Sequence, residues 1–434
     1  MARQRLGSKI GIGLLGLGVV GGGVCQALTH KAAALSERAG VPLAIEGILV
    51  RDLKKSRAVK APARLLTTDP ERVLENPRVD IVVELLGGEQ PALEYIERAL
   101  RSGRHVVTAN KEVLAKHGPR LLALGRELGV SLQFEGSVGG GIPIIGPLLD
   151  DLLANDITAV YGIINGTTNY ILTRMARDGL DFGAALKQAQ DLGYAEADPS
   201  NDVAGTDAAY KLAILATLAF HTHIRPEDVY REGIERLTGR DFRHARELGY
   251  AIKLLAIAKA EDGAVQARVH PVLLPQDYPL AKVEGVFNAV QVEGDLVGPL
   301  LFQGRGAGAQ PTASAVVADI IRAARHIQGN APYPPPLLND SRTLRPMAEI
   351  RTRYYIRLGV ADRPGVLAQI ARILGDEGIS IASVIQKEVD EEAQTAELVI
   401  MTHQAQEAAV QEALKRLEGL AVVSEVSNYL RVED

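Results

Sequence analysis

Short apolar runs alternate with longer amphipathic segments through the first third of the chain. The runs have the length of buried strands, and the segments between them have the periodicity of helices. Strands are expected at residues 9–17, 42–50, 64–67, 79–86, 105–108 and 130–134, and helices at residues 19–38, 90–101 and 111–128. This alternation predicts a doubly wound parallel sheet, an α/β fold whose ligand crevice lies beyond the carboxyl ends of the strands.

The pattern changes after Pro143. A strand-like run at residues 157–164 leads into helices that continue to residue 192, and an apolar helix is expected at residues 208–220. Alternating segments follow at residues 252–260, 265–274, 286–292 and 300–303, before a last helix at residues 313–325. This order predicts an α+β domain with a largely antiparallel sheet on one side of its helices.

The end of the chain is expected to contain a stiff linker and a small domain. A Tyr-Pro-Pro-Pro run at residues 333–336 marks the linker. Beyond it the order is β-α-β-β-α-β, which is ferredoxin-like, with segments at residues 354–360, 366–376, 379–387, 393–402, 404–417 and 421–430. We therefore divide the chain into residues 1–140, 141–330, 331–352 and 353–434, and expect the last helix of the second part to return to the first.

Composition narrows the class of protein. The 434 residues are 47% hydrophobic and 23% charged, with a net charge of −5, as in soluble globular enzymes. No basic surplus favours nucleic acid, no segment is apolar enough to span a membrane, and the glycines after Ile10 argue against a secretory signal. The single cysteine, Cys25, excludes a disulfide framework and a cysteine-rich zinc site, so a reducing, cytoplasmic compartment is expected.

A glycine-rich turn joins the first expected strand to the first helix. The run Gly16-Leu-Gly18-Val19-Val20-Gly21 matches G-x-G-x-x-G. The spacing alone is a weak signal, but between a strand and a helix it indicates a dinucleotide site. The glycines there permit a tight turn and let the backbone approach a pyrophosphate at the helix N-terminus.

The second expected strand ends at Arg51, where folds that select NAD usually carry an acid for the ribose hydroxyls. Lys54 and Lys55 follow closely, so a contact with the 2′-phosphate of NADP is favoured. Asp52 leaves NAD open as a cofactor. The alternative is that these are solvated surface charges.

A stretch rich in acids precedes the apolar helix of the middle region. Its loop carries Glu196, Asp198 and Asp202, and the helix carries Asp207 and Lys211, with Thr206 as the expected N-cap. A lysine at the head of a buried helix must be paired or lose its proton, and either condition suits a general acid or base. An ordinary ion pair between Asp207 and Lys211 is the alternative.

Three other places are candidate binding sites. Gly87 and Lys111 follow expected strands and so fall on the ligand side, although a surface lysine at a helix start would look the same. The glycine run that begins at Glu135 exposes carbonyl groups that could surround a hard cation, or it is a hinge. In the small domain, Pro364 and Gly365 shape a strand–helix turn whose amides suit a carboxylate ligand.

Together these motifs resemble one family over nearly the whole chain, the monofunctional homoserine dehydrogenases with a C-terminal ACT domain. The matching runs are Gly16-Leu-Gly-Val-Val-Gly21, Thr108-Ala-Asn-Lys111, Asn165-Gly-Thr-Thr-Asn169, Gly193-Tyr-Ala-Glu196-Ala-Asp-Pro199, Asp207-Ala-Ala-Tyr-Lys211, Gly306-Ala-Gly308 with Pro311-Thr, and Asp362-Arg-Pro-Gly365. The resemblance implies a Rossmann-type domain, an α+β catalytic and dimerisation domain, and an ACT regulatory domain. It also implies NAD(P)-dependent reduction of L-aspartate 4-semialdehyde to L-homoserine, for threonine and methionine biosynthesis, in a homodimer or homotetramer.

The resemblance also implies residue roles. Lys211 would move the proton at the substrate carbonyl, Lys111 would support it, and Glu196 and Asp207, with Asp202 on the same loop, would bind the substrate. Gly193 and Gly306 join the cofactor contacts expected from Gly16, Gly18, Val19, Val20, Gly21, Arg51, Gly87 and Lys111. The family's monovalent-cation site, for an ion such as Na⁺, matches Glu135, Val138, Gly140 and Ile142. L-threonine would be the effector of the ACT domain, at the turn formed by Asp362, Pro364, Gly365, Val366 and Leu367.

Two other classes of protein stay open. Aspartate-semialdehyde dehydrogenase acts on the same metabolite but needs a nucleophilic cysteine, and Cys25 is misplaced for that role inside the first helix. A non-enzymatic redox or amino-acid sensor with the same binding domains would have no need of Asp207 and Lys211.

Overall fold

The computed structural model describes residues 9–329, 338, 342–390 and 394–433, and side chains are described except at residues 387–390. Contacts divide the chain into two compact units. Unit 1 contains residues 1–164, 210–228 and 287–341, and unit 2 contains residues 165–209, 229–286 and 342–434. Residues 331–337 and 339–341 of the expected linker at residues 331–352, which include its Tyr-Pro-Pro-Pro run, lie outside the described residues. The expected domain boundaries stay a prediction.

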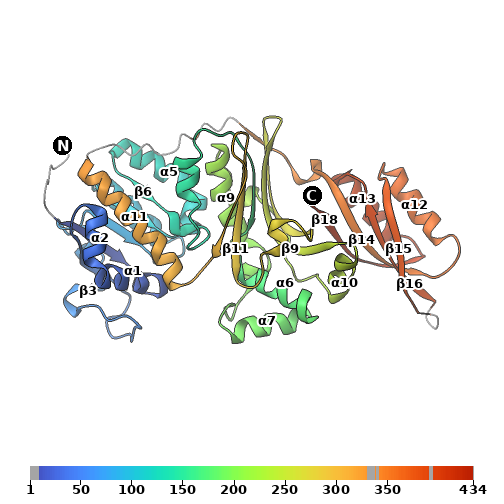
Figure 1. The fold of residues 1–434 in the computed structure, drawn as a ribbon, viewed down its shortest axis with the longest axis horizontal. Helices are drawn as coiled ribbons and strands as arrows, with labels where there is room; N and C mark the ends of the chain where they lie inside the picture. Colours follow the sequence, from blue (N-terminus) through green and yellow to red (C-terminus); the bar gives the residue numbers. More distant parts are fainter. Residues whose placement is uncertain (1–8, 330–337, 339–341, 391–393, 434) are drawn as a thin grey trace. The chain divides into compact units, whose positions relative to one another are not determined.

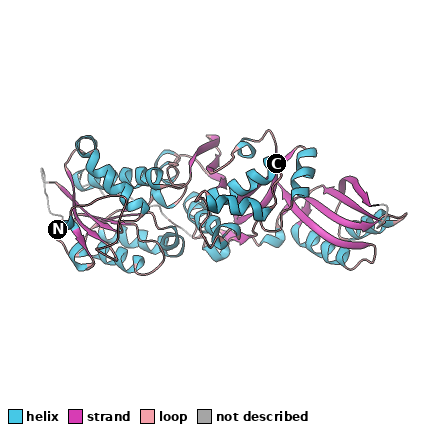
Figure 2. Cartoon of the chain, turned by 90° about the horizontal axis from the view of Figure 1, so that it is seen from below, coloured by secondary structure: helices cyan, strands magenta, loops and turns pink. Residues whose placement is uncertain are grey.

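The first sheet of unit 1 is the expected doubly wound parallel sheet. Its strand order is β3-β2-β1-β4-β5-β6, and every pair is parallel. The strands are β1 (Ile10–Leu15), β2 (Leu43–Leu49), β3 (Leu66–Thr67), β4 (Ile81–Glu84), β5 (His105–Thr108) and β6 (Leu132–Gln133). The helices are α1 (Val19–His30), α2 (Ala32–Ala39), α3 (Glu71–Leu74), α4 (Ala92–Arg101) and α5 (Lys111–Leu128). Helices cover both faces of this sheet (Figure 2).

A helix from much later in the chain completes this part of unit 1. Helix α11 (Ala309–Gly329) lies alongside α1 (Figure 1), and a Cβ added at Gly23 would lie only 2.7 Å from the carbonyl oxygen of Ala309. Its buried residues Val316 and Ile320 join the same apolar core as Ile12 of β1. The approach of the two helices therefore depends on the absence of a side chain at Gly23.

Unit 1 also contains three antiparallel strands of the second sheet and most of a buried helix. The strands are β7 (Ile157–Ile163), β11 (Phe287–Gly294) and β12 (Gly298–Arg305), with β11 between the other two. Helix α9 (Thr206–Phe220) begins in unit 2 and continues in unit 1. It packs on α5, because Ala213, Ile214 and Thr217 line a small cavity together with Leu114 and Leu122.

Unit 2 combines helices with a long mixed sheet of order β9-β10-β18-β14-β16-β15. The helices are α6 (Gly166–Asp178), α7 (Phe182–Asp191), α8 (Ser200–Val203), α10 (Gly239–Glu247), α12 (Val366–Asp376) and α13 (Glu407–Glu418). The strands are β8 (Tyr230–Arg231), β9 (Tyr250–Glu261), β10 (Ala264–Pro275), β13 (Thr343–Leu344), β14 (Arg351–Ala361), β15 (Ile381–Asp390), β16 (Thr395–Thr402), β17 (Ala405–Gln406) and β18 (Val423–Val432). The four long strands and two helices after residue 350 have the expected ferredoxin-like order.

The C-terminal strands are part of the same sheet as the middle region. Strand β18 pairs in parallel with β10, through Val272 with Arg431 and Leu273 with Val432. On the sheet face away from its own helices, Arg357 of β14 donates to Asp241 of α10 at 2.9 Å and to Glu397 of β16 at 2.9 Å. These groups are buried, and burial without a partner would be costly, so the ion pairs hold α10 on this face.

Three local expectations differ from the structure. The helix expected at residues 19–38 is broken at Lys31, whose backbone leaves the helical region at φ −110° and ψ 19°. Helix α9 begins at Thr206 itself, and the Gly205 carbonyl accepts from Ala209 at 2.9 Å, so the N-cap assigned to Thr206 is wrong by one residue. Helix α10 was not expected, although Thr238 and Asp241 form a capping box at its start.

Candidate active site

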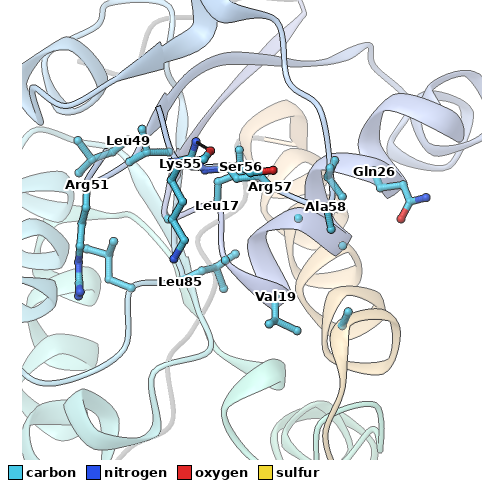
Figure 3. A pocket seen from close by; sticks show the side chains of 18 of the residues that line it. Leu17, Val19, Gln26, Leu49, Arg51, Lys55, Ser56, Arg57, Ala58 and Leu85 are labelled. Atoms are coloured by element: carbon cyan, nitrogen blue, oxygen red, sulfur yellow. Dashed lines mark hydrogen bonds between the residues drawn. The ribbon is translucent and has the colours of Figure 1, made fainter. Parts of the chain in front are cut away.

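The glycine turn after β1 lines a cavity of unit 1 about 610 Å³ in volume. The turn contributes Gly16, Gly18 and Val19, the loop after β2 contributes Arg51 and Lys55, and the start of α11 closes one side (Figure 3). In Figure 3 the side chains of Arg51 and Lys55 extend in the same direction across the cavity. Val20, by contrast, is partly buried against the core and is not among the residues that line this cavity, so its role as a cofactor contact stays a prediction.

The glycines shape this turn for a ligand that must approach the backbone. Gly16 has φ +108°, which favours glycine, and a Cβ at Gly21 would lie 2.2 Å from the Gly16 carbonyl oxygen. A Cβ at Gly18 would meet no protein atom within 4 Å, although Gly18 lines the cavity. The space next to Gly18 is therefore open to a ligand, and the residues present fit a pyrophosphate at the N-terminus of α1.

The loop after β2 is organised by its own basic and acidic groups. Asp52 accepts from the Lys54 amide at 2.7 Å, and the Arg57 side chain donates to the carbonyl oxygens of Asp52 and Lys55. Arg51 is exposed beside the cavity. Arg57, which was not predicted as a site residue, thus stabilises the loop that places Arg51 beside the cavity.

A buried carboxyl group organises the ends of β4 and β5, and it was not predicted. Glu84 is fully buried; it accepts from Thr108 at 2.6 Å and from the Leu86 amide at 2.7 Å. Burial raises the pKa of Glu84 above its ordinary value. Asn110 donates to the Gly88 carbonyl at 2.7 Å and caps α5. The sequence feature that could have indicated this role is the presence of a charged residue, Glu84, inside an apolar strand run.

Lys111 and Gly87 lie at this edge of the sheet, as expected from their positions after strands. Lys111 is the first residue of α5 and is half-buried, and Gly87 is exposed with φ +75°. Helix α5 brings Lys116 to 5.9 Å from the ring centre of Tyr210, the residue before Lys211. The helices that carry the two candidate lysines therefore pack against each other within unit 1.

Two of the expected substrate carboxylates meet on one amide. Asn165 Nδ2 donates to Asp202 Oδ1 at 2.7 Å and to Asp207 Oδ2 at 2.9 Å. The amide oxygen of Asn165 accepts from the Thr168 amide at 2.8 Å, which fixes its orientation at the start of α6. Asp207 is 5% exposed and Asp202 is half-buried, so the amide offsets part of the cost of burying two carboxylates together.

Lys211 and Glu196 have different environments. Lys211 is half-buried one turn after Asp207, and its ammonium group donates to the Ile164 carbonyl at 2.8 Å. Glu196 lies exposed on its loop, where no hydrogen bond or ion pair among the described residues engages its carboxylate. Gly193, also on this loop, is exposed with φ +73° and belongs to unit 2, so its role as a cofactor contact stays a prediction.

The Glu135 side chain is occupied by the protein itself. Its carboxylate accepts from the amides of Ile144 at 2.7 Å, Ile145 at 2.9 Å and Gly146 at 2.8 Å. A Cβ at Gly140 (φ +59°) would lie 2.4 Å from the Gly306 carbonyl oxygen, so these two expected site residues touch. Among the described residues no group of three histidine, cysteine or acidic side chains could hold a metal. The backbone carbonyls of Glu135, Val138, Gly140 and Ile142 are the remaining donors for a cation.

Asp319 of α11 supports the same loop. It is fully buried, accepts from the Glu135 amide at 2.8 Å and pairs with Arg322 at 2.7 Å. Burial raises the pKa of Asp319 to about 7, with the Arg322 charge opposing that effect and Glu135 adding to it. Asp319 therefore keeps its proton to a higher pH than an exposed aspartate does.

This shift predicts pH-dependent stability. The folded protein binds the Asp319 proton more tightly than the unfolded chain, so the stabilisation is lost as the pH rises from the unfolded pKa towards the folded one. We expect the unfolding free energy of the wild type, relative to that of Asp319→Asn, to fall by roughly 4 kcal/mol between about pH 4 and about pH 7, and the difference in Tm to fall with it. Parallel Tm curves for the two proteins would contradict this assignment.

The expected effector turn lies on the surface of unit 2. Asp362 is exposed and accepts from Gln386 at 3.0 Å, and Gly365 has φ +86° just before α12. Pro364 is exposed, Val366 is buried in the core and Leu367 is 44% exposed. The amides of Asp362, Arg363 and Val366 already donate to backbone carbonyls, but an exposed position at the start of an 11-residue helix still suits an anionic group.

Two other expectations from the sequence concern the single cysteine and membrane-spanning helices. Cys25 is 3% exposed in α1, and burial raises the pKa of its thiol, so it is a poor nucleophile. In the described part of the chain, no helix is both long enough and apolar enough to cross a membrane.

Known proteins resemble this chain along nearly its whole length. The family model for the NAD-binding domain of homoserine dehydrogenase matches residues 16–135, the model for homoserine dehydrogenase matches residues 143–321, and the ACT domain model matches residues 354–421. A homoserine dehydrogenase of Neisseria gonorrhoeae is 43% identical over 98% of each chain, and one of Bacillus subtilis is 40% identical over 98% of each.

Solved structures give the same result. The crystal structure of a homoserine dehydrogenase from Thiobacillus denitrificans has a TM-score of 0.92 and 44% identity, covering 98% of this chain and 99% of its own. A hyperthermophilic archaeal homoserine dehydrogenase in complex with NADPH has a TM-score of 0.62 and 30% identity, covering 73% of this chain and 97% of its own. The fold and the cavity thus define an oxidoreductase with an NAD(P)-binding domain and an ACT domain. This chain belongs to the homoserine dehydrogenase family.

Proposed function

We propose that this chain catalyses the reversible reduction of L-aspartate 4-semialdehyde to L-homoserine, a step of threonine and methionine biosynthesis, with NADP as its preferred cofactor. The observation that carries the proposal is the Asn165 amide, which ties Asp202 and Asp207 together at the start of the helix that bears Lys211. Two carboxylates suit an α-ammonium group, and a lysine one helical turn away suits the reacting oxygen.

The glycine turn after β1, with Arg51 and Lys55, would hold NADP(H), and the cofactor would supply the hydride chemistry between alcohol and aldehyde. Reduction leaves an alkoxide on the substrate, and this oxygen must gain a proton. The Lys211 ammonium supplies that proton and stabilises the developing negative charge, and in the oxidation direction the amine form of Lys211 removes it. The contact of Lys211 with the Ile164 carbonyl directs the ammonium group before the substrate binds.

The other candidates position the substrate. Asp207 and Glu196 bind the α-ammonium group together with Asp202, which the Asn165 amide joins to Asp207. Lys111 lies at the cofactor–substrate junction at the start of α5. Because Glu196 is exposed and unengaged among the described residues, we expect it to take up its role only when substrate is present.

Recognition of the α-ammonium group gives the direct test of the proposed substrate. Succinate semialdehyde has the same aldehyde and carboxylate but lacks the amino group. We expect kcat/KM with NADPH to be at least about 100-fold higher for aspartate 4-semialdehyde, because the carboxylates stay unpaired with the analogue. Equal reduction of both aldehydes would contradict the proposed substrate.

The preference for NADP rests on Arg51. It lines the cavity at the end of β2, and the Asp52 carboxylate is engaged by the Lys54 amide. We expect Arg51→Ala to raise KM for NADPH about tenfold, and KM for NADH less than about twofold, because only NADPH carries the 2′-phosphate.

The control for this variant is Arg64→Ala, since Arg64 is also exposed in unit 1 but does not line the cavity. It should leave both KM values unchanged. An equal rise in KM for both cofactors in Arg51→Ala would show that Arg51 does not read the 2′-phosphate.

The proposal has three further parts. A monovalent cation such as Na⁺ is held by the backbone carbonyls of Glu135, Val138, Gly140 and Ile142, because the Glu135 carboxylate is already occupied. L-threonine acts as a feedback inhibitor at the exposed turn from Asp362 to Leu367, where the α12 amides take its carboxylate. The active form is a homodimer or homotetramer, as the resemblance implies.

A further inference from the structure

One ion-pair cluster of unit 2 has no part in the reaction described above, yet it joins the last strand of the chain to the acidic loop. Arg431 of β18 is 1% exposed. Its guanidinium group binds Glu407 at 2.8 and 2.6 Å, and Glu232 at 2.9 and 3.0 Å. Each carboxylate receives two hydrogen bonds, the geometry in which arginine fixes orientation best.

Glu232 is held from its backbone as well as from its side chain. Its amide donates to the Val269 carbonyl at 2.8 Å, directly after β8 pairs with β10. Tyr230 donates to the Glu232 carboxylate, and the Arg431 guanidinium lies 5.4 Å from the centre of the Tyr230 ring. The short segment at residues 232–234 therefore has a fixed position between β10 and β18.

The acidic loop lies directly on this segment. The Ile234 amide donates to the Val203 carbonyl at 3.0 Å. A Cβ added at Gly233 would lie 2.5 Å from the Val203 oxygen and 3.0 Å from Ala204 Cα, so the contact exists only because residue 233 is glycine. Val203 and Ala204 belong to α8 and its end, which also carry Asp202.

The same contact reaches the start of α9. The Gly205 amide donates to the Asp202 carbonyl at 3.0 Å, and the Gly205 carbonyl accepts from Ala209 at 2.9 Å. A Cβ at Gly205 (φ +78°) would lie 3.5 Å from the Glu232 carbonyl oxygen. A shift of the segment at residues 232–234 would thus move both Asp202 and the first turn of α9, which contains Asp207.

We propose that Arg431 and Glu232 are positioning residues for the substrate-binding loop: their ion pair fixes the segment at residues 232–234, and that segment fixes Asp202 and Asp207. The inference rests on the proposed function, because it takes these two carboxylates to bind the substrate. Arg431 belongs to β18, which follows the residues that the ACT domain model matches, so the structural support for the substrate loop comes from the last strand of the chain.

The test variant is Glu232→Gln, which keeps the shape of the side chain and leaves Arg431 paired with Glu407. We expect KM for homoserine to rise about three- to tenfold, with KM for NADP and kcat within about twofold of the wild type. Amide hydrogen exchange in peptides covering residues 200–209 should become faster. The matched control is Glu377→Gln, because Glu377 also pairs with an arginine of the same unit, Arg416, at 2.5 Å. The two side chains are similarly exposed, 23% for Glu377 and 28% for Glu232.

A second variant changes the same contact at a different residue, so the test does not depend on the folding of Glu232→Gln alone. Gly233→Ala leaves the ion pair intact and pushes on the Val203 carbonyl, so it should give the same selective rise in KM for homoserine. The inference is overturned if both variants leave this KM and the exchange rates unchanged, or if Glu377→Gln changes them as much. If the wild type does not oxidise homoserine, the proposed function fails, and the exchange rates alone then decide whether the ion pair holds the loop.

Discussion

Replacing Lys211 with alanine is expected to lower kcat for homoserine oxidation by about 10²–10⁴-fold, or roughly 3–5 kcal/mol of transition-state stabilisation. The ammonium group that the Ile164 carbonyl orients is the proposed proton donor and acceptor, and alanine can replace neither role. The Kd for NADPH should stay within about twofold, because Lys211 does not line the glycine-turn cavity. Steady-state kinetics and a separate cofactor titration measure the two effects.

Two further variants serve as controls for this result. Lys187→Ala removes a lysine that is 69% exposed and pairs with Asp191 on α7, and it should leave turnover normal. Lys211→Arg keeps the positive charge but does not release a proton near neutral pH, so it should recover charge stabilisation without restoring the rate. If Lys211→Ala retained kcat within about tenfold of the wild type, Lys211 could not be the group that moves the proton.

Replacing Gly18 with alanine is expected to weaken NADPH binding by about 10- to 100-fold without harming the fold. A Cβ at this position meets no protein atom within 4 Å, so its only obstacle is a ligand in the cavity that Gly18 lines. A methyl group there would separate the turn from the pyrophosphate, at a cost of roughly 1–3 kcal/mol in binding. Fluorescence titration with NADPH gives the Kd, and the Tm without cofactor should match that of the wild type.

The control is Gly118→Ala in α5, where an added Cβ also meets nothing within 4 Å outside the helix itself. Gly118 does not line the glycine-turn cavity, so this variant should bind NADPH normally and be slightly more stable, since alanine favours a helix. Normal NADPH affinity in Gly18→Ala would mean that the pyrophosphate does not approach this turn.

Local and strongly periodic features could be predicted from the sequence. Strand β5 and helix α5 have the expected bounds, and the glycine turn after β1 lines the cavity as its spacing implied. Each of these depends on interactions between residues close in the chain, where apolar periodicity, glycine and capping groups determine the structure. The family resemblance then added site residues that spacing alone could not assign.

Features that depend on distant contacts were missed. Glu84 was read as part of an apolar strand, because nothing local shows that Thr108 would satisfy its carboxyl group. The role of Asn165 in joining Asp202 to Asp207 requires a contact between α6 and the acidic loop. Helix α10 is too rich in charge for an apolar stripe to reveal it, since Asp241 and His244 are buried against Arg357 and Glu397 instead.

The most direct test is the initial rate of homoserine oxidation by the wild-type protein, measured with NADP and with NAD, each with and without millimolar threonine. We predict homoserine-dependent reduction of NADP, slower turnover with NAD, and a lower rate of homoserine oxidation when threonine is present. Turnover that threonine does not affect would support the proposed reaction and contradict threonine as the effector. Absence of homoserine-dependent reduction of either cofactor would contradict the proposed function itself.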